Sequence, residues 1–378
     1  MHICFITNKY PNKVEPNAIV FLQQLVNAIA KKGVRCSVIC PVPTNLNRAY
    51  KTLPEHCVEM YGDAEVEIYY PRYFGLGQKD YLCFNPAKFT TNRFSKAVES
   101  VVRALPEVPD AFYAHFITPA GICAARMGRV FDRPSFVAYG EATLGTINHY
   151  GQDAVKRELA SLTGVIAVST QNKEMIAPFV QEGITEVFPN AIDGARFYPR
   201  DKAAAREKFG LTPEDFVIAF VGSFDKRKGT DRLSAAVDRL DGNIKLMCAG
   251  KGALPPTTER CIYQQPVLNA ELPEFLSAAD IFVLPTLHEG CCNAIIEAMA
   301  CGLPIVSANR SFNDDILDET NSLRIDPTSV EEIAEAIKRL REDENLRRRL
   351  AEGSLEKAKR LTLESRAERI LQFMEKVK

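Results

Sequence analysis

Two glutamates, Glu289 and Glu297, stand on either side of the predicted start of a helix. The apolar run Ile281–Leu284 predicts a buried strand before them, and Asn293 is a favoured N-cap residue for a helix over residues 294–300. The unpaired N–H groups of a first helical turn attract phosphate, whereas carboxylates repel phosphate and accept hydrogen bonds from hydroxyls. A nucleotide-diphosphate sugar, with phosphates between two hydroxyl-rich rings, would satisfy both. The alternative is that Glu297 solvates a helix surface and Glu289 caps a loop.

A basic loop bounded by glycines follows a second apolar strand, predicted at Phe216–Val221. Gly222 would let the backbone approach a ligand closely, and Arg227 and Lys228 offer cations to a diphosphate. Basic loops are usually solvated turns, but this one follows a strand end, where the ligands of parallel sheets bind. We therefore expect Arg227 and Lys228 to face a pyrophosphate, together with N–H groups near residues 290–293.

The elements that must position these residues alternate between strand-like and helix-like runs. Such alternation is typical of an α/β fold, in which a parallel sheet carries helices on both faces. A chain of 378 residues exceeds what one hydrophobic core usually supports, so two domains are expected. The other predicted strands are residues 2–7, 34–40, 66–70, 111–115, 135–139, 164–168 and 243–249, and helices are predicted at 19–32, from 329 to about 341, and from 362 onward.

Composition excludes several classes of function. A net charge of −1 gives no overall field for nucleic acid, so no nucleic-acid partner is expected. Eleven cysteines without a Cys-x-x-Cys pair point to reduced thiols and a cytoplasmic protein. We expect Met1–Thr7 to form a first strand rather than a signal peptide, and no apolar run reaches the roughly 18 residues of a membrane span.

The motif Glu289, then Glu297-Ala298-Met299-Ala300-Cys301-Gly302-Leu303-Pro304, resembles that of the family-4 retaining glycosyltransferases. The resemblance implies the GT-B fold, in which two Rossmann-like doubly wound domains face each other across a cleft. It implies an acceptor-binding domain at 1–195, a nucleotide-sugar-binding domain at 196–360 and a helix at 361–378 that crosses back to the first domain. The implied reaction transfers a sugar from a UDP- or GDP-sugar to a saccharide or lipid-linked acceptor, in polysaccharide or glycolipid synthesis. No cofactor is implied, and without an Asp-x-Asp motif we expect no required metal.

The resemblance also implies roles for individual residues. Glu289 would hold hydroxyls of the donor sugar, Glu297 the ribose, and His115 would lie beside the reacting sugar, with Arg227 and Lys228 completing the catalytic set. Besides Glu297, the implied donor-binding residues are Gly222, Ser223, Leu268, Gly290, Cys291, Cys292 and Asn293, and the acceptor-side residues are Asn17, Tyr139 and Glu141.

The chain departs from the family pattern at three places. Asn17-Ala18 replaces the usual pair of glycines, and Tyr139-Gly140-Glu141 stands where the family often has His-Gly-x-Asp. Ser223 takes the place of an arginine, so Arg227 would supply the guanidinium.

Two other functions remain open from the sequence: a nucleotide-sugar epimerase of the same fold, and a two-domain sugar-binding protein. The helix-like run at residues 88–105 is basic and amphipathic. We expect it to be a solvated face over a core; peripheral contact with the inner face of an anionic membrane is the alternative.

Overall fold

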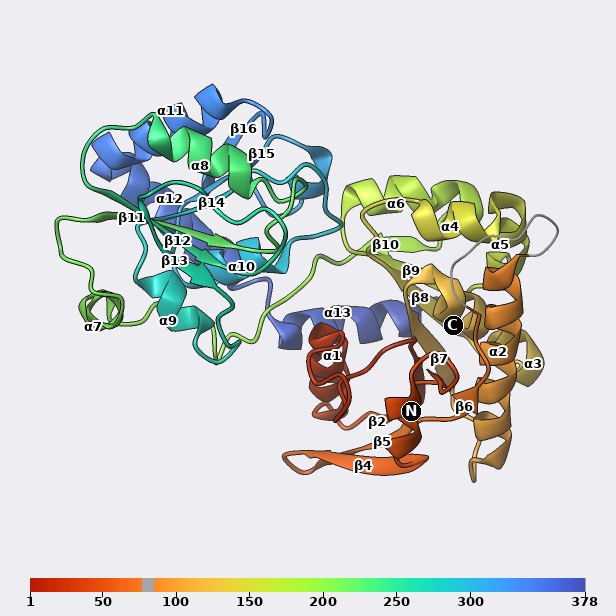
Figure 1. The fold of residues 1–378 in the computed structure, drawn as a ribbon. Coiled ribbons are helices and arrows are strands. Elements are labelled where there is room, and N and C mark those ends of the chain that lie inside the picture. The colour runs from red at the N-terminus through yellow and green to blue at the C-terminus, as the bar shows by residue number, and fades with distance from the viewer. Residues whose placement is uncertain (77–84, 378) are drawn as a thin grey trace. The chain divides into compact units, whose positions relative to one another are not determined.

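The computed structural model describes residues 1–76 and 85–377, which divide into two compact units (Figure 1). Unit 1 comprises Met1–Phe188 and Leu363–Lys378, and unit 2 comprises Pro189–Thr362. The first boundary between the units falls after Phe188, before the expected boundary at 195, because Ile192 and Phe197 pack into the hydrophobic core of unit 2.

The sheet of unit 1 has eight strands in the order β10-β9-β8-β7-β1-β2-β5-β4. All neighbours are parallel except β4 and β5, which form an antiparallel hairpin at one edge. Because β1 has β2 on one side and β7 on the other, the direction of the strand order reverses between β1 and β7. The strands are β1 (His2–Ile6), β2 (Arg35–Ile39), β4 (His56–Tyr61), β5 (Ala64–Tyr69), β7 (Ala111–His115), β8 (Ser135–Tyr139), β9 (Gly164–Ala167) and β10 (Thr185–Val187).

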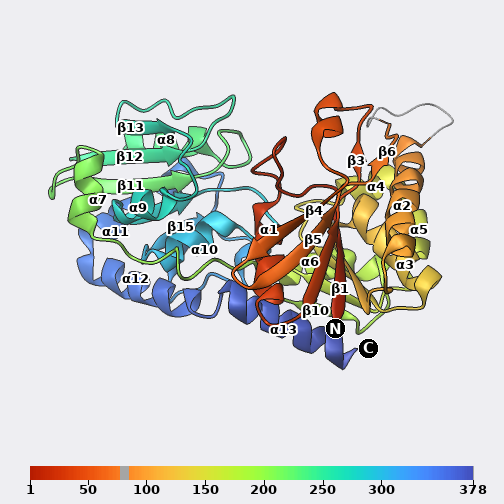
Figure 2. The same cartoon turned by 90° about the horizontal axis from the view of Figure 1, so that it is seen from below.

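Helices cover both faces of this sheet (Figures 1 and 2). On one face α2 (Pro86–Ala104), α3 (Ile122–Phe131), α4 (Gly145–Tyr150) and α5 (Gln152–Leu159) pack over one hydrophobic core. On the other face lie α1 (Val20–Ala30) and the last helix, α13 (Leu363–Lys376). The basic run therefore forms a helix that buries Phe94, Val98 and Val102 against the core.

The smaller elements of unit 1 lie between these. They are β3 (Val42–Pro43), which pairs with β6 (Arg72–Tyr73), and η1 (Arg48–Thr52), η2 (Ile117–Gly121), α6 (Thr170–Ile176) and η3 (Ala177–Phe179).

The sheet of unit 2 has six parallel strands in the order β13-β12-β11-β14-β15-β16. The chain runs outward from β11 to β13, then returns to place β14 on the other side of β11. The strand order thus reverses between β11 and β14, which is where doubly wound sheets bind ligands. The strands are β11 (Phe216–Val221), β12 (Ile244–Ala249), β13 (Cys261–Gln265), β14 (Ile281–Leu284), β15 (Ile305–Ala308) and β16 (Ser322–Ile325).

The helices of unit 2 flank this sheet on both sides. They are α7 (Lys202–Lys208), α8 (Thr230–Asp238), α9 (Leu272–Ser277), α10 (Asn293–Ala300), η4 (Ser311–Asn313), α11 (Val330–Glu342) and α12 (Glu344–Ala358). The Ser329 hydroxyl caps α11 by accepting the N–H of Glu332 at 3.1 Å, as its sequence predicts. Over the described ranges 1–76 and 85–377, no helix has both the length and the apolarity of a membrane span.

Candidate functional site

Two cations meet one glutamate where the strand order of unit 2 reverses. Lys228 Nζ lies 2.6 Å and Arg227 Nη1 lies 2.5 Å from the same oxygen, Oε1 of Glu289. The Thr286 hydroxyl donates a third hydrogen bond to that oxygen at 2.9 Å. Arg227 and Lys228 follow β11, whereas Thr286 and Glu289 follow β14. The carboxyl ends of these two adjacent strands therefore carry one charged cluster.

The loop after β11 is held in place by hydrogen bonds within the loop and to neighbouring loops. Asp225 Oδ1 accepts the N–H of Lys228 at 2.8 Å, and the Arg227 carbonyl accepts the N–H of Leu287 at 2.9 Å. Gly222 lies beside the Lys228 stem, because a Cβ placed on it would be 3.3 Å from Lys228 Cδ. The exposed Ser223 hydroxyl bonds Asp225 at 2.5 Å. These contacts fix the two cations next to Glu289.

The electrostatics of the cluster favour a charged lysine. Lys228 is only 8% exposed. Burial alone would lower the pKa of Lys228, but the charges of Cys292 and Glu289 outweigh burial and raise it. The trio of Arg227, Lys228 and Glu289 carries two positive charges and one negative charge, so it retains a net attraction for an anion.

The helix α10 begins beside this cluster. The prediction that Asn293 is its N-cap is wrong by one residue: Cys292 is the N-cap and Asn293 is the first helical residue. The Cys292 side chain bonds no backbone N–H as a cap; its sulfur instead accepts from Lys228 Nζ at 3.8 Å. Asn293 Oδ1 accepts a hydrogen bond from Asn190 at 2.8 Å, so its side chain is engaged away from the helix backbone.

Glu297 lies one turn further along α10 and has different surroundings from Glu289. Burial raises the pKa of its carboxyl to about 7, and the charge of Arg196 partly opposes that rise. Leu268, by contrast, is 69% exposed and stands on the loop between β13 and α9. Gly290 is buried and Cys291 half-buried in the turn that leads to α10.

In unit 1, His115 ends β7, where the strand order reverses. Its ring is 4% exposed and lies 5.0 Å from the Phe21 ring and 4.6 Å from the Phe116 ring, centroid to centroid. Burial, helped by the charge of Arg366, lowers the pKa of His115 to about 3. The imidazole is therefore neutral at physiological pH.

The predicted acceptor-side residues separate into different environments. Glu141 Oε1 accepts the N–H of Ile117 at 3.1 Å, and burial raises the pKa of this carboxyl to about 7. Tyr139 is fully buried among residues of α3 and α4, on the sheet face opposite to His115. Asn17 is exposed in the loop after β1.

Three further residues reach the predicted donor site although the sequence analysis assigned them no role there: Thr286, Asn190 and Arg196. Thr286 is two residues beyond the end of β14, so the strand end could have suggested it. Asn190 lies 101 residues from Cys291, and Arg196 lies 73 residues from Asn269. No local sequence pattern marks such contacts.

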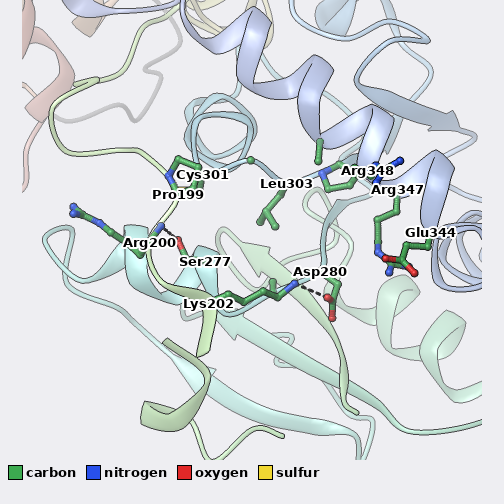
Figure 3. Close-up of a pocket in the computed structure, with 14 residues that line it drawn as sticks. Pro199, Arg200, Lys202, Ser277, Asp280, Cys301, Leu303, Glu344, Arg347 and Arg348 are labelled. Atoms are coloured by element: carbon green, nitrogen blue, oxygen red, sulfur yellow. Dashed lines mark hydrogen bonds and ion pairs between the residues drawn. The ribbon is translucent and has the colours of Figure 1, made fainter. Parts of the chain in front are cut away.

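A separate cavity of about 300 Å³ lies in unit 2 at the amino ends of β14 and β15 (Figure 3). Its wall mixes charged side chains with apolar ones such as Leu303 and Pro304, and Lys202 Nζ is paired with Asp280 at 2.6 Å. The cavity is at the amino ends of the strands and Glu289 follows the carboxyl end of β14, so the cavity is distinct from the charged cluster. Within the part of the chain that the structure describes, no group of three or more His, Cys, Asp or Glu side chains is placed to hold a metal ion.

Comparison with known proteins finds a matching family and relatives that are named as glycosyltransferases. Residues 201–357 match the family described as Glycosyl transferases group 1. The chain is 28% identical, over 356 residues, to the putative teichuronic acid biosynthesis glycosyltransferase TuaC of Bacillus subtilis, covering 90% of this chain and 89% of TuaC.

Solved structures show the same fold at lower identity. Sucrose-phosphate synthase from Thermosynechococcus elongatus superposes with a TM-score of 0.76 at 18% identity, covering 100% of this chain and 98% of that one. HepE from Anabaena, solved in complex with UDP, gives 0.73 at 17% identity with full coverage of both chains. The chain therefore has the GT-B fold, and its residues 201–357 are similar to the family Glycosyl transferases group 1.

Proposed function

We propose that this protein transfers a sugar from a UDP- or GDP-sugar to a hydroxyl acceptor with retention of the anomeric configuration, as family-4 enzymes do. The observation that carries the proposal is the convergence of Arg227 and Lys228 on Glu289 at the strand-order reversal of unit 2. A diphosphate needs cations and a sugar needs hydrogen-bond acceptors, and this cluster supplies both within one hydrogen-bonded group.

The cations would act on the leaving group. When the bond between sugar and diphosphate breaks, negative charge grows on the diphosphate, and groups already held in place stabilise it most effectively. Arg227 and Lys228 are held by Glu289 and by the loop backbone, and the N–H groups of residues 290–293 at the start of α10 would add to their field.

The carboxylates would bind the two rings of the donor. Glu289 would accept hydrogen bonds from the sugar hydroxyls and Glu297 from the ribose, while Gly222, Ser223 and the loop with Leu268 would complete the donor site. Unit 2 would thus be the nucleotide-sugar-binding domain.

Unit 1 would be the acceptor-binding domain. A neutral His115 would lie beside the reacting sugar, and a carboxyl such as Glu141, with a pKa near 7, suits hydrogen bonding to an acceptor hydroxyl. Asn17 and Tyr139 would lie on this acceptor side.

The relatives support the same class of reaction. TuaC is named for teichuronic acid biosynthesis, and the HepE structure holds UDP. We accordingly place the reaction in the synthesis of a cell-surface polysaccharide or glycolipid, with a saccharide or lipid-linked acceptor. The enzyme would need no metal and would work in the cytoplasm, peripherally at the inner face of the membrane where the acceptor is lipid-linked.

The test is turnover of radiolabelled UDP-, GDP- and ADP-sugars with a panel of saccharide and lipid-linked acceptors. We expect one donor to yield a labelled glycoside of retained configuration plus free nucleoside diphosphate. Lys228→Ala should lower kcat by about 100-fold, which is the usual loss when a donor to a developing oxyanion is removed. Its melting temperature serves as the folding control.

The products distinguish the rival functions. Release of free, epimerised sugar with no acceptor would identify an epimerase instead, and binding without turnover would identify a sugar-binding protein. Activity that disappears with a chelator and returns with a divalent cation would contradict the metal-free reaction.

A further inference from the structure

Residues 190–196, near the start of unit 2, contact two loops of the proposed donor site: the turn before α10 and the loop between β13 and α9. Asn190 Nδ2 donates to the Cys291 carbonyl at 3.1 Å and to Asn293 Oδ1 at 2.8 Å. These partners lie in the turn that precedes α10 and in its first residue. One amide group therefore ties down the loop whose N–H groups would face the diphosphate.

The other end of the segment reaches the second loop. Arg196 Nε donates to the Asn269 carbonyl at 3.2 Å, next to Leu268 on the loop between β13 and α9. The Arg196 charge also acts on the Glu297 carboxyl. Asn190 and Arg196 thus contact two different loops of the site proposed for a nucleotide-diphosphate sugar.

A segment can position other loops only if it is itself fixed, and this one is. Ile192 and Phe197 are buried in the core of unit 2, and the Ile192 N–H bonds the Leu361 carbonyl at 2.9 Å. Between them, the Asp193 carbonyl accepts the N–H groups of Arg196 and Phe197 at 3.0 and 2.9 Å. Asn190 and Arg196 therefore project from a segment anchored to the core.

We propose that residues 190–196 position the donor site. Asn190 fixes the loop that would meet the diphosphate, and Arg196 fixes the loop between β13 and α9, which would meet the nucleotide base and is called the base-side loop below. The inference rests on the proposed function, because it concerns the same donor. Both are positioning residues: neither needs to touch the reacting atoms, and each acts through backbone that would do so.

The two residues should affect different parts of the ligand. Removing Asn190 frees the loop that would meet the diphosphate, so binding of a nucleoside diphosphate should weaken while binding of the monophosphate changes little. Removing Arg196 frees the base-side loop, so mono- and diphosphate should weaken together. A general loss of structure would not separate the two ligands in this way.

Isothermal titration of UDP, GDP and ADP, and of the matching monophosphates, tests the proposal. With the nucleotide that the wild type binds, Asn190→Ala and Asn190→Asp should each weaken diphosphate binding about tenfold, the scale of one lost hydrogen bond. The same variants should leave monophosphate binding within about twofold. Arg196→Ala should weaken both ligands to the same degree, and Arg196→Lys should restore part of the loss.

Asn45→Ala is the matched control. Its side chain also makes two hydrogen bonds to a loop, with the Gly75 carbonyl at 2.7 Å and the Gly75 N–H at 3.0 Å, but in unit 1. It should leave nucleotide affinity unchanged. Wild-type protein that binds none of the nucleotides would reject the proposed function itself. Binding by the wild type with unchanged affinities in the Asn190 and Arg196 variants would reject only the positioning role.

Discussion

At the scale of the single residue, the Glu297 carboxyl makes the free energy of unfolding depend on pH. Burial raises the pKa of its carboxyl from the ordinary 4.5 to about 7. The folded chain therefore holds this proton more tightly than the unfolded chain does, and the free energy of unfolding falls as pH rises from about 4.5 to about 7. Above that window the carboxylate is charged in both states and the loss is complete.

Glu297→Gln removes this titration, so its stability gain over wild type should be larger at pH 8 than at pH 4. The gain over wild type should be on the order of 2 kcal/mol, since each pKa unit corresponds to about 1.4 kcal/mol and the residue is half-buried, which calls for a discount. Urea unfolding of both proteins at pH 4, 6 and 8 measures it. In the proposed role the carboxylate accepts ribose hydroxyls, so nucleotide affinity of the wild type should rise with pH through about 7 and that of the variant should not.

Glu335→Gln is the control, because this glutamate lies on the exposed face of α11 in the same unit. Comparing the two variants separates the loss of a buried carboxyl from the loss of an exposed one. Parallel pH curves for wild type and Glu297→Gln would contradict the buried carboxyl.

At the scale of the element, the loop after β11 depends on the loop after β12. The Phe224 N–H bonds the Lys251 carbonyl at 3.0 Å, and the Leu254 N–H bonds the Phe224 carbonyl at 2.9 Å. Between them, a Cβ placed on Gly250 would lie 1.9 Å from the Gly222 carbonyl oxygen. Since that neighbour is backbone, it cannot move aside without displacing the loop that carries Arg227 and Lys228.

Gly250→Ala should therefore weaken nucleotide-diphosphate binding at least tenfold and lower the unfolding free energy by about 1–3 kcal/mol, as overpacked sites do. Calorimetric titration and urea unfolding measure the two effects. Gly145→Ala is a suitable control, because the nearest atom to its Cβ would be the Thr143 hydroxyl at 3.4 Å and its backbone is unstrained. Normal affinity in Gly250→Ala would mean that the two loops are not coupled.

The elements that the sequence predicts best are those buried on both faces. Phe216–Val221 and Ile281–Leu284 are continuous apolar runs, and the structure confirms both as strands with the predicted ends. The strands that the sequence analysis missed include β4, β10, β13 and β16, which alternate or mix polar residues at the margins of the sheets. Their pairing is decided by the neighbouring strand rather than by their own composition.

The candidate site, too, contains residues that the sequence could group and contacts that it could not predict. Arg227, Lys228 and Glu289 could be grouped from sequence because each follows an apolar strand, and adjacent parallel strands end at the same edge. The hydrogen bonds of Asn190 could not be predicted, since they join residues about a hundred positions apart. The start of α10 was misplaced because Asn293, a good N-cap by type, uses its side chain for Asn190 instead.

At the scale of the whole molecule, the end of the chain completes the unit in which the chain begins. The Phe373 ring of α13 lies 6.2 Å from that of Phe136 and 5.8 Å from that of Phe188, and Arg366 donates to the Phe188 carbonyl. Lys32, two residues beyond α1, pairs with Glu368 at 3.5 Å. The helix therefore covers one face of the unit 1 sheet, although residues 189–362 separate it from the rest of that unit.

Ending the chain after Thr362 should unfold unit 1 and spare unit 2. The truncation exposes Phe136 and removes the buried Ile370, Phe373 and Met374, each worth about 1.5–3 kcal/mol of burial, against a total stability of about 5–15 kcal/mol for a domain. Hydrogen exchange followed by mass spectrometry should show lost protection in β8 and β9 with β11 and β14 unchanged. Ending the chain after Met374 removes Glu375, Lys376 and Val377, which are exposed or half-buried, together with the last residue, and should preserve protection in both units. If the Thr362 truncation kept β8 and β9 protected, unit 1 would be stable without its last helix, and α13 would be a surface addition rather than part of the fold.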